Sequence, residues 1–123
     1  MPFVRGIRGA TTVEDNTKEQ ILQATQELLE GLVDANAIEA DDLAAALFTT
    51  TEDLNAAFPA LAARQMGWHY VALLDGHEMR VPDALARCIR VLLMVNTEKR
   101  PQELIHVYMK GAKDLRERGM GEV

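Results

Sequence analysis

Two arginines lie where charged side chains are uncommon, and they are the residues best suited to chemistry. Arg90 interrupts the apolar run CIRVLLMV at residues 88–95, and a short strand over residues 3–10 places Arg8 on the face opposite Ile7. A guanidinium that is kept from water without a partner costs several kcal/mol. Each arginine therefore needs a buried partner, an anionic ligand or a path to water, and we expect the two to form a site that holds an anion.

A carboxylate and a phenol complete the candidate set: Glu78 and Tyr108, with Arg64 and Arg116 as further cations. Several arginines beside one carboxylate and one phenol can bind carboxylates bidentately and donate hydrogen bonds to an oxygen that gains negative charge. Such a pocket suits a reaction without covalent or acid-base steps. A structural alternative stays open, in which Arg90 and Glu78 form a buried salt bridge and no ligand binds.

The usual residues of hydrolysis and group transfer are missing from the sequence. It contains no phosphate-binding glycine loop and no nucleophile elbow. His69, His77 and His106 stand in neither a His-x-x-His nor a His-x-x-x-His relation, so we expect no metal site and no cofactor. Cys88 is expected to be a buried apolar residue, because no histidine lies nearby in sequence to activate it.

Length and composition indicate one domain over residues 1–118, followed by a flexible C-terminal tail at 119–123. No apolar stretch approaches the ~20 residues of a membrane helix, so we expect no membrane partner. The net charge is −6, and the 9 Lys/Arg of residues 80–118 are diluted by 5 Asp/Glu, which argues against nucleic acid. The single cysteine and the lack of an export signal predict a cytoplasmic protein.

The elements that would position these residues are one long helix and several strands. A capping-box pattern and helical apolar spacing predict a helix from about Thr17 to Asn36. The other expected elements are strands at 3–10, 43–51, 68–74 and around Arg90, a short helix at 59–66, a turn at 75–77, and a helix from Pro101 through about 108–110. This is an α+β pattern. One long helix cannot cover both faces of such a sheet, so we expect the other face to meet another subunit.

Six blocks of sequence follow one another in a distinctive order and spacing. They are VRGIRGATTV at residues 4–13, DL at 53–54 with FPA at 58–60, GWHYV at 67–71, EM at 78–79, CIRV at 88–91 and HVY at 106–108. From about residue 3 to residue 118 they resemble, in register, the monofunctional AroH-type chorismate mutases. The resemblance implies a mixed β-sheet with one long helix and short helices, assembled as a homotrimeric pseudo-α/β-barrel with active sites at the subunit interfaces. It also implies conversion of chorismate to prephenate, in phenylalanine and tyrosine biosynthesis.

The resemblance also assigns roles to individual residues. Arg90 would contact the ether oxygen and a carboxylate of chorismate, Glu78 would accept from the ring hydroxyl, and Arg8 and Tyr108 would bind a carboxylate. The pocket would be lined, partly from the neighbouring subunit, by Phe58, Ala60, Arg64, Leu74, Asp75, Gly76, His77 and Leu115, and Arg116 would help to close it. Two positions depart from the family pattern, because Leu61 stands where lysine is common and Asp75 where cysteine or another small residue is familiar.

The chemistry of this reaction agrees with the residues that are present. In a Claisen-type rearrangement one carbon–oxygen bond breaks as a carbon–carbon bond forms, so catalysis reduces to holding the reactive conformer and stabilising charge on the ether oxygen. Two other functions stay open. One is a small trimeric enamine or imine deaminase in which an arginine holds a carboxylate, and the other is a trimer that only binds carboxylates or only assembles.

Overall fold

The structure is a computed structural model that describes residues 2–115, and within them it joins a five-stranded mixed sheet to one long helix. In chain order the elements are β1 (Phe3–Thr12), α1 (Lys18–Asn36), β2 (Leu43–Thr50), α2 (Ala60–Gln65), β3 (Ala72–His77), β4 (Cys88–Thr97) and β5 (Val107–Tyr108), with 3-10 turns at Ala40–Asp42, Pro101–Glu103 and Lys110–Ala112. The predicted α+β class is confirmed, with one long helix and a mixed sheet.

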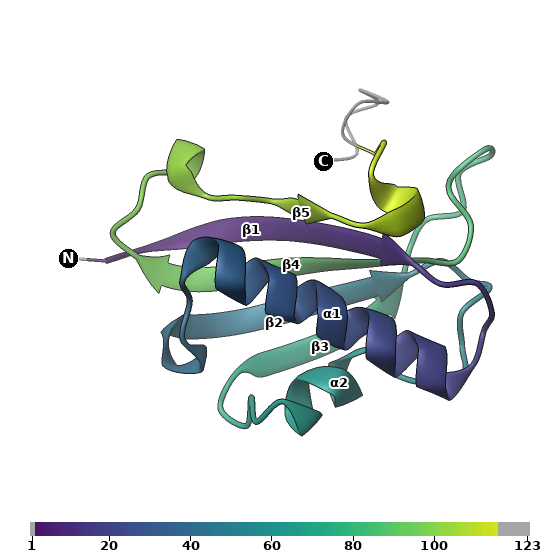
Figure 1. Ribbon diagram of the computed structural model, residues 1–123, viewed down its shortest axis with the longest axis horizontal. Coiled ribbons are helices and arrows are strands. Elements are labelled where there is room, and N and C mark those ends of the chain that lie inside the picture. Colours follow the sequence, from purple (N-terminus) through teal and green to yellow (C-terminus); the bar gives the residue numbers. More distant parts are fainter. Residues whose placement is uncertain (1, 116–123) are drawn as a thin grey trace.

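The strands lie in the order β3-β2-β4-β1-β5 (Figure 1). The central strand, β4, pairs antiparallel with β1 on one side and with β2 on the other. The edge strands β3 and β5 run parallel to β2 and β1. The sheet therefore mixes both pairing modes, and β1 carries the alternation that places Ile7 and Arg8 on opposite faces.

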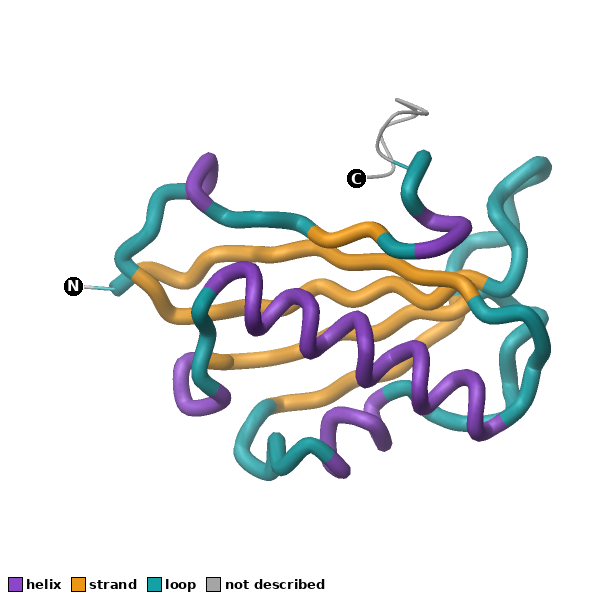
Figure 2. The backbone as a smooth tube through the Cα atoms, viewed as in Figure 1, coloured by secondary structure: helices purple, strands orange, loops and turns teal. Residues whose placement is uncertain are grey.

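Helix α1 begins at the predicted cap, where the Thr17 hydroxyl accepts a hydrogen bond from the Gln20 amide at 3.2 Å. The helix crosses one face of the sheet, and α2 lies on the same face beside β3 (Figure 2). A Cβ at Gly9 of β1 would lie 2.8 Å from a methyl group of Leu32, so glycine lets the helix approach the strand closely. The main core packs between these layers and includes Ile7, Leu28, Leu29, Leu32, Phe48 and Leu93.

The opposite face of the sheet is not covered by any described helix. Along β4 the residues alternate, so that Val91 and Leu93 are buried under α1 while Leu92 and Met94 are 38% and 36% exposed on the other side. Leu74 of β3 is 63% exposed. This face therefore presents apolar side chains that no described helix covers.

Two predicted elements are wrong in their placement. The strand expected at 68–74 begins only at Ala72 and runs to His77, because Trp68 and Val71 are buried in the core ahead of it and the expected turn pairs with the end of β2. The helix expected from Pro101 is a single 3-10 turn followed by β5, since the exposed edge of β1 offers backbone partners to Val107 and Tyr108. Across residues 2–115, none of the helices combines the length and the apolar character that a bilayer span needs.

Candidate active site

Arg8, Arg90 and Tyr108 meet on the uncovered face of the sheet. In the β1–β4 ladder Ala10 pairs with Arg90 and Arg8 with Leu92, and Ala10 also pairs with Tyr108 of β5. Side chains at alternate positions of neighbouring strands share a face. The three residues line a hollow of about 340 Å³, together with Leu47, Thr49 and Leu92. The sequence prediction that the two strand arginines form one site is therefore consistent with the geometry.

Glu78 reaches this hollow from the end of β3. Its amide donates to the Thr50 carbonyl at 2.9 Å, which continues the pairing of β3 with β2 for one more residue. Its Oε2 accepts from the Thr49 hydroxyl at 2.9 Å and lies 3.1 Å from Arg90 Nε. The Arg90 Nε–H is not aligned on the carboxylate as a hydrogen bond requires, so the contact is an ion pair held mainly by charge.

The ion pair is partly buried, with Arg90 25% and Glu78 15% exposed at their side chains. Two guanidinium groups and one carboxylate leave the hollow with a formal charge of +1, which favours an anionic ligand. The salt bridge that sequence reasoning offered as an alternative does form. It orients the Arg90 side chain on Glu78.

Tyr108 carries a hydroxyl that is buried and has no hydrogen-bond partner among the described residues. A buried donor left without a partner costs about 1–3 kcal/mol. Because Tyr108 lines the hollow beside the two arginines, an oxygen of a bound anion would satisfy its hydroxyl. Leu115, another predicted lining residue, is 1% exposed and packs in a small core with Ala10 and Cys88, against which Tyr108 lies.

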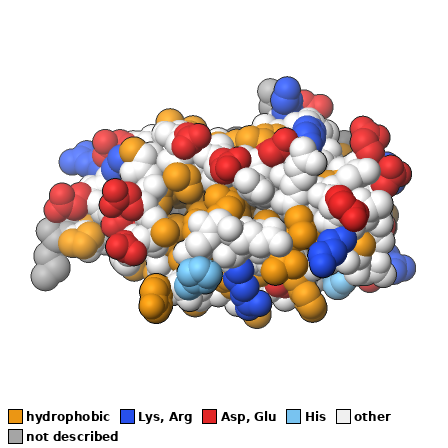
Figure 3. Space-filling view, turned by 60° about the horizontal axis from the view of Figure 1, so that its bottom comes forward, with side chains coloured by type: hydrophobic (Ala, Val, Ile, Leu, Met, Phe, Trp, Pro, Cys, Tyr) orange, Lys and Arg blue, Asp and Glu red, His pale blue; other side chains and the backbone are white. Residues whose placement is uncertain are grey.

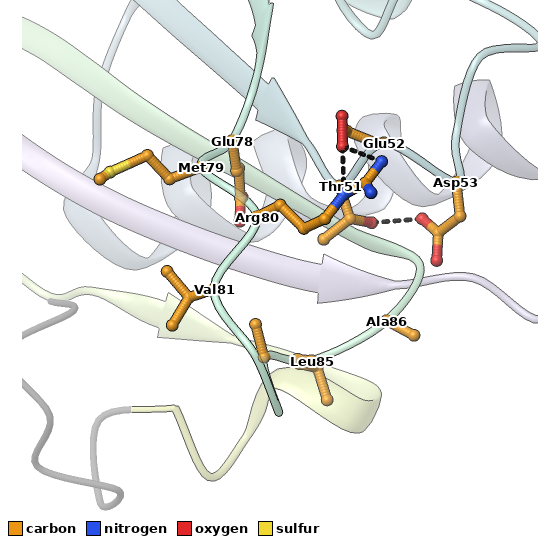
Figure 4. A pocket seen from close by; sticks show the side chains of 10 residues that line it. Thr51, Glu52, Asp53, Glu78, Met79, Arg80, Val81, Leu85 and Ala86 are labelled. Carbon is orange, nitrogen blue, oxygen red and sulfur yellow. Dashed lines mark hydrogen bonds and ion pairs between the residues drawn. The ribbon is translucent and has the colours of Figure 1, made fainter.

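A second cavity borders Glu78, and its lining side chains are drawn in Figure 4. It measures about 430 Å³ and lies between the segment that follows β2 and the loop after β3. Its rim is tied by an ion pair between Arg80 and Glu52, whose closest atoms are 2.6 Å apart. Both side chains are well exposed, so this pair stabilises the rim little. Glu78 thus stands between two hollows.

Four of the remaining predicted lining residues, Phe58, Asp75, Gly76 and His77, form a separate group on another part of the chain. A cavity of about 490 Å³ opens between the start of α2 and the end of β3, and its lining includes Phe58, Leu61, Asp75, Gly76, His77 and Lys18. Phe58 is 73% exposed there. Viewed from the side of α2 and β3, hydrophobic side chains reach the surface among single charged groups (Figure 3). Ala60 is buried and Arg64 is exposed on α2, whereas Arg116 lies outside the described residues.

The sheet itself separates the two groups. Asp75 pairs with the buried Phe48 and therefore projects toward α2, whereas Arg90 pairs with Thr49 and projects to the uncovered face. Asp75 Oδ1 accepts a hydrogen bond from the Ala60 amide at 3.0 Å. Burial raises the pKa of Asp75 above its ordinary value, while the Ala60 hydrogen bond and the Arg64 charge act in the opposite direction. Within one chain, Asp75 does not share the hollow of Arg90.

Sequence reasoning missed two polar residues that the structure ties to this site. Thr49 donates its hydroxyl to Glu78, and the signal for it was its position in the alternation of β2, on the same face as Leu47. His106 accepts a hydrogen bond from the backbone of Arg8, a contact that no spacing in the sequence indicates because the residues are 98 positions apart. Both contacts depend on tertiary structure.

Comparison with known proteins identifies the family. The family model for chorismate mutase type I matches residues 4–118. The chorismate mutase AroH of Thermus thermophilus is 54% identical over 115 residues, covering 93% of this chain and 94% of the relative. The chorismate mutase AroH of Bacillus subtilis is 44% identical over 115 residues, covering 93% and 91%. A solved chorismate mutase from Clostridium thermocellum superposes with a TM-score of 0.87 at 51% identity, covering 88% of this chain and 96% of that one. The chain therefore belongs to the chorismate mutase type I family.

Proposed function

We propose that this protein rearranges chorismate to prephenate, as an isomerase of aromatic amino-acid biosynthesis, in sites that two copies of the chain complete together. The observation that carries the proposal is the hollow that holds Arg8, Arg90 and the Tyr108 hydroxyl, with Glu78 at its side. These groups match the substrate. Chorismate has two carboxylates, an ether oxygen and a ring hydroxyl, and it is a dianion at neutral pH.

The roles follow from where charge changes during the reaction. As the carbon–oxygen bond breaks, negative charge grows on the ether oxygen, and the fixed guanidinium of Arg90 stabilises it. Arg8 and Tyr108 bind a carboxylate, which holds the chain that must fold over the ring. Glu78 accepts the hydrogen of the ring hydroxyl and at the same time orients Arg90. No proton is transferred and no covalent intermediate forms, so the site needs no nucleophile.

Neighbouring strands hold the principal groups. Arg8 and Arg90 stand on β1 and β4, which pair over their whole length from Phe3–Thr97 to Thr12–Cys88. Groups carried on such a ladder keep their mutual spacing better than groups on loops. The reaction depends on positioning and electrostatics alone. The paired strands supply the positioning, and the arginines that they carry supply the charge.

We propose a homotrimer, as the resemblance implies. The group around Arg90 and the group around Phe58 and Asp75 lie on different faces of one protomer, so a neighbouring copy must bring the second group to the first. An interface that joins two different patches closes into a ring when the rotation permits. Such a ring would bury the uncovered face that displays Leu74, Leu92 and Met94. The single, buried Cys88 suits a reducing compartment, and we place the enzyme in the cytoplasm.

An assay that follows the loss of chorismate absorbance tests the activity. Arg90→Lys keeps the charge but loses the planar fork, so kcat should fall by about 10²-fold while KM changes less. Arg100→Lys is the matched control, since Arg100 is exposed and lies beyond β4, and it should keep normal kinetics. Release of ammonia from an imino acid would favour the deaminase. Binding of chorismate without turnover would favour a non-enzymatic trimer.

A further inference from the structure

The backbone of β1 has an unusual partner at Arg8. Strand β5 has only two residues, and its pairing with β1 covers Gly9 with Val107 and Ala10 with Tyr108. One residue earlier, the Arg8 amide donates to Nδ1 of the His106 ring at 2.9 Å. The imidazole therefore stands where the carbonyl of a longer strand would stand. Because the donor is a backbone N–H, Nδ1 must present its lone pair, which places the ring proton on Nε2.

The segment that carries His106 is itself anchored to the core helix. The side chain of Asn36, at the end of α1, binds both backbone groups of Ile105: its Oδ1 accepts from the Ile105 amide at 2.8 Å, and its Nδ2 donates to the Ile105 carbonyl at 2.9 Å. The same Nδ2 donates to the Leu32 carbonyl at 3.0 Å. Asn36 is 3% exposed. Asn36 thus fixes residue 105 to α1, and the next residue in the chain, His106, binds the backbone of Arg8.

We propose that His106 is a positioning residue, which fixes the backbone of β1 at Arg8 so that the guanidinium meets the substrate carboxylate. The proposal rests on the function proposed above, in which Arg8 binds that carboxylate. Because its amide points toward β5, Arg8 stands opposite Leu92 without exchanging backbone hydrogen bonds with it, and the imidazole is the partner of that amide. Misplacement of a binding group by about 1 Å can reduce catalysis by about 10²-fold. The acceptor at His106 Nδ1 therefore controls the position of the Arg8 guanidinium relative to the substrate carboxylate.

Three substitutions separate the acceptor from the bulk of the ring. In His106→Asn the side-chain oxygen sits at the place of Nδ1, in His106→Gln it sits one bond farther, at the place of Nε2, and His106→Leu has the shape of asparagine without an acceptor. We expect His106→Leu and His106→Gln to raise KM for chorismate about tenfold with little change in kcat, and His106→Asn to stay within about threefold of the parent. Circular dichroism and thermal unfolding check that each variant is folded. If His106→Leu does not fold, the comparison of His106→Asn with His106→Gln still tests the inference.

A double-mutant cycle tests whether His106 acts through Arg8. In an Arg8→Ala background the guanidinium is absent, so His106→Gln should have no further effect on KM. An equal effect in both backgrounds would overturn the inference, and so would equal kinetics of the asparagine and glutamine variants. These outcomes differ from failure of the proposed function, which would appear as no chorismate turnover in the parent, and from failure of the role of Arg8, which would appear as a normal KM in Arg8→Ala alone.

Discussion

Two inactive variants of this chain should restore each other's activity if every site is built from two copies. Arg90→Ala disables the group on the uncovered face, and Arg64→Ala removes the cation carried by α2 beside Asp75. Alone, each variant should lose about 10²-fold or more in kcat, since each removes a charge that faces a dianionic substrate. Co-expression of the two variants with different tags, followed by purification through both tags, yields only mixed assemblies.

The expected recovery can be worked out from the arrangement. In a ring of three, each site takes its first group from one copy and its second group from the next. Every mixed ring then contains one site with both arginines intact, so activity should return to about a third of the parent value. Chorismate consumption measures it. Recovery no better than the average of the two single variants would show that each copy carries a whole site, and would refute the division of the site by the sheet.

A control with both substitutions in one chain removes the remaining ambiguity. When Arg64→Ala/Arg90→Ala chains are mixed with the parent chain and purified through both tags, only neighbouring parent copies complete a site. Shared sites then predict about a sixth of the parent activity, whereas independent sites predict about a half. The two models therefore differ threefold in an experiment in which every ring contains the same two kinds of chain.

Three further predictions concern stability, pH and the two carboxylates. Thr11 has a buried hydroxyl without a hydrogen-bond partner among the described residues, so Thr11→Val should raise the free energy of unfolding by about 1 kcal/mol in urea titrations, whereas Thr25→Val, which loses a 2.7 Å bond to the Ile21 carbonyl, should not. Burial raises the pKa of Asp75 in the folded chain, so the contribution of this residue to stability is greater below that pKa and decreases as pH rises through it. Asp75→Asn keeps an oxygen for the Ala60 amide and should reduce the dependence of the unfolding free energy on pH. An unaltered pH profile of stability would contradict this assignment. Asp75→Ala and Asp75→Cys should change kcat/KM by less than about tenfold, while Glu78→Ala should cost considerably more, and steady-state kinetics with the reverse ranking would place the hydroxyl acceptor on Asp75.

Much of the fold could be predicted because its signals are local. The Thr17 cap and the apolar spacing that follows define α1, and the run around Arg90 defines β4. The failures occur where distant residues decide. Residues after Pro101 have helix-like composition, but the Asn36 side chain and the edge of β1 hold them extended. The start of β3 was misplaced because strand-like residues such as Trp68 can be buried without pairing.

The site was predictable to the extent that a charge in an apolar strand is a signal. Arg8, Arg90 and Tyr108 do line one hollow, and Glu78 reaches it. What the sequence could not indicate was the division of the candidates between two faces, since that depends on strand register. Asp75 is three residues from Glu78 in sequence, yet its side chain caps the start of α2 rather than joining the arginines.

The alternation along β1 and β4 means that core packing and the lining of the candidate site are encoded in adjacent positions. Ile7 and Val91 are buried in the core, and their immediate neighbours Arg8 and Arg90 line the hollow on the other face. A single layer of backbone separates the two sides, and Gly9 brings α1 directly against it. A core substitution beneath β1 or β4 thus lies one peptide plane away from an arginine of the candidate site, and changes in core volume and in the position of that arginine are coupled through the same strand.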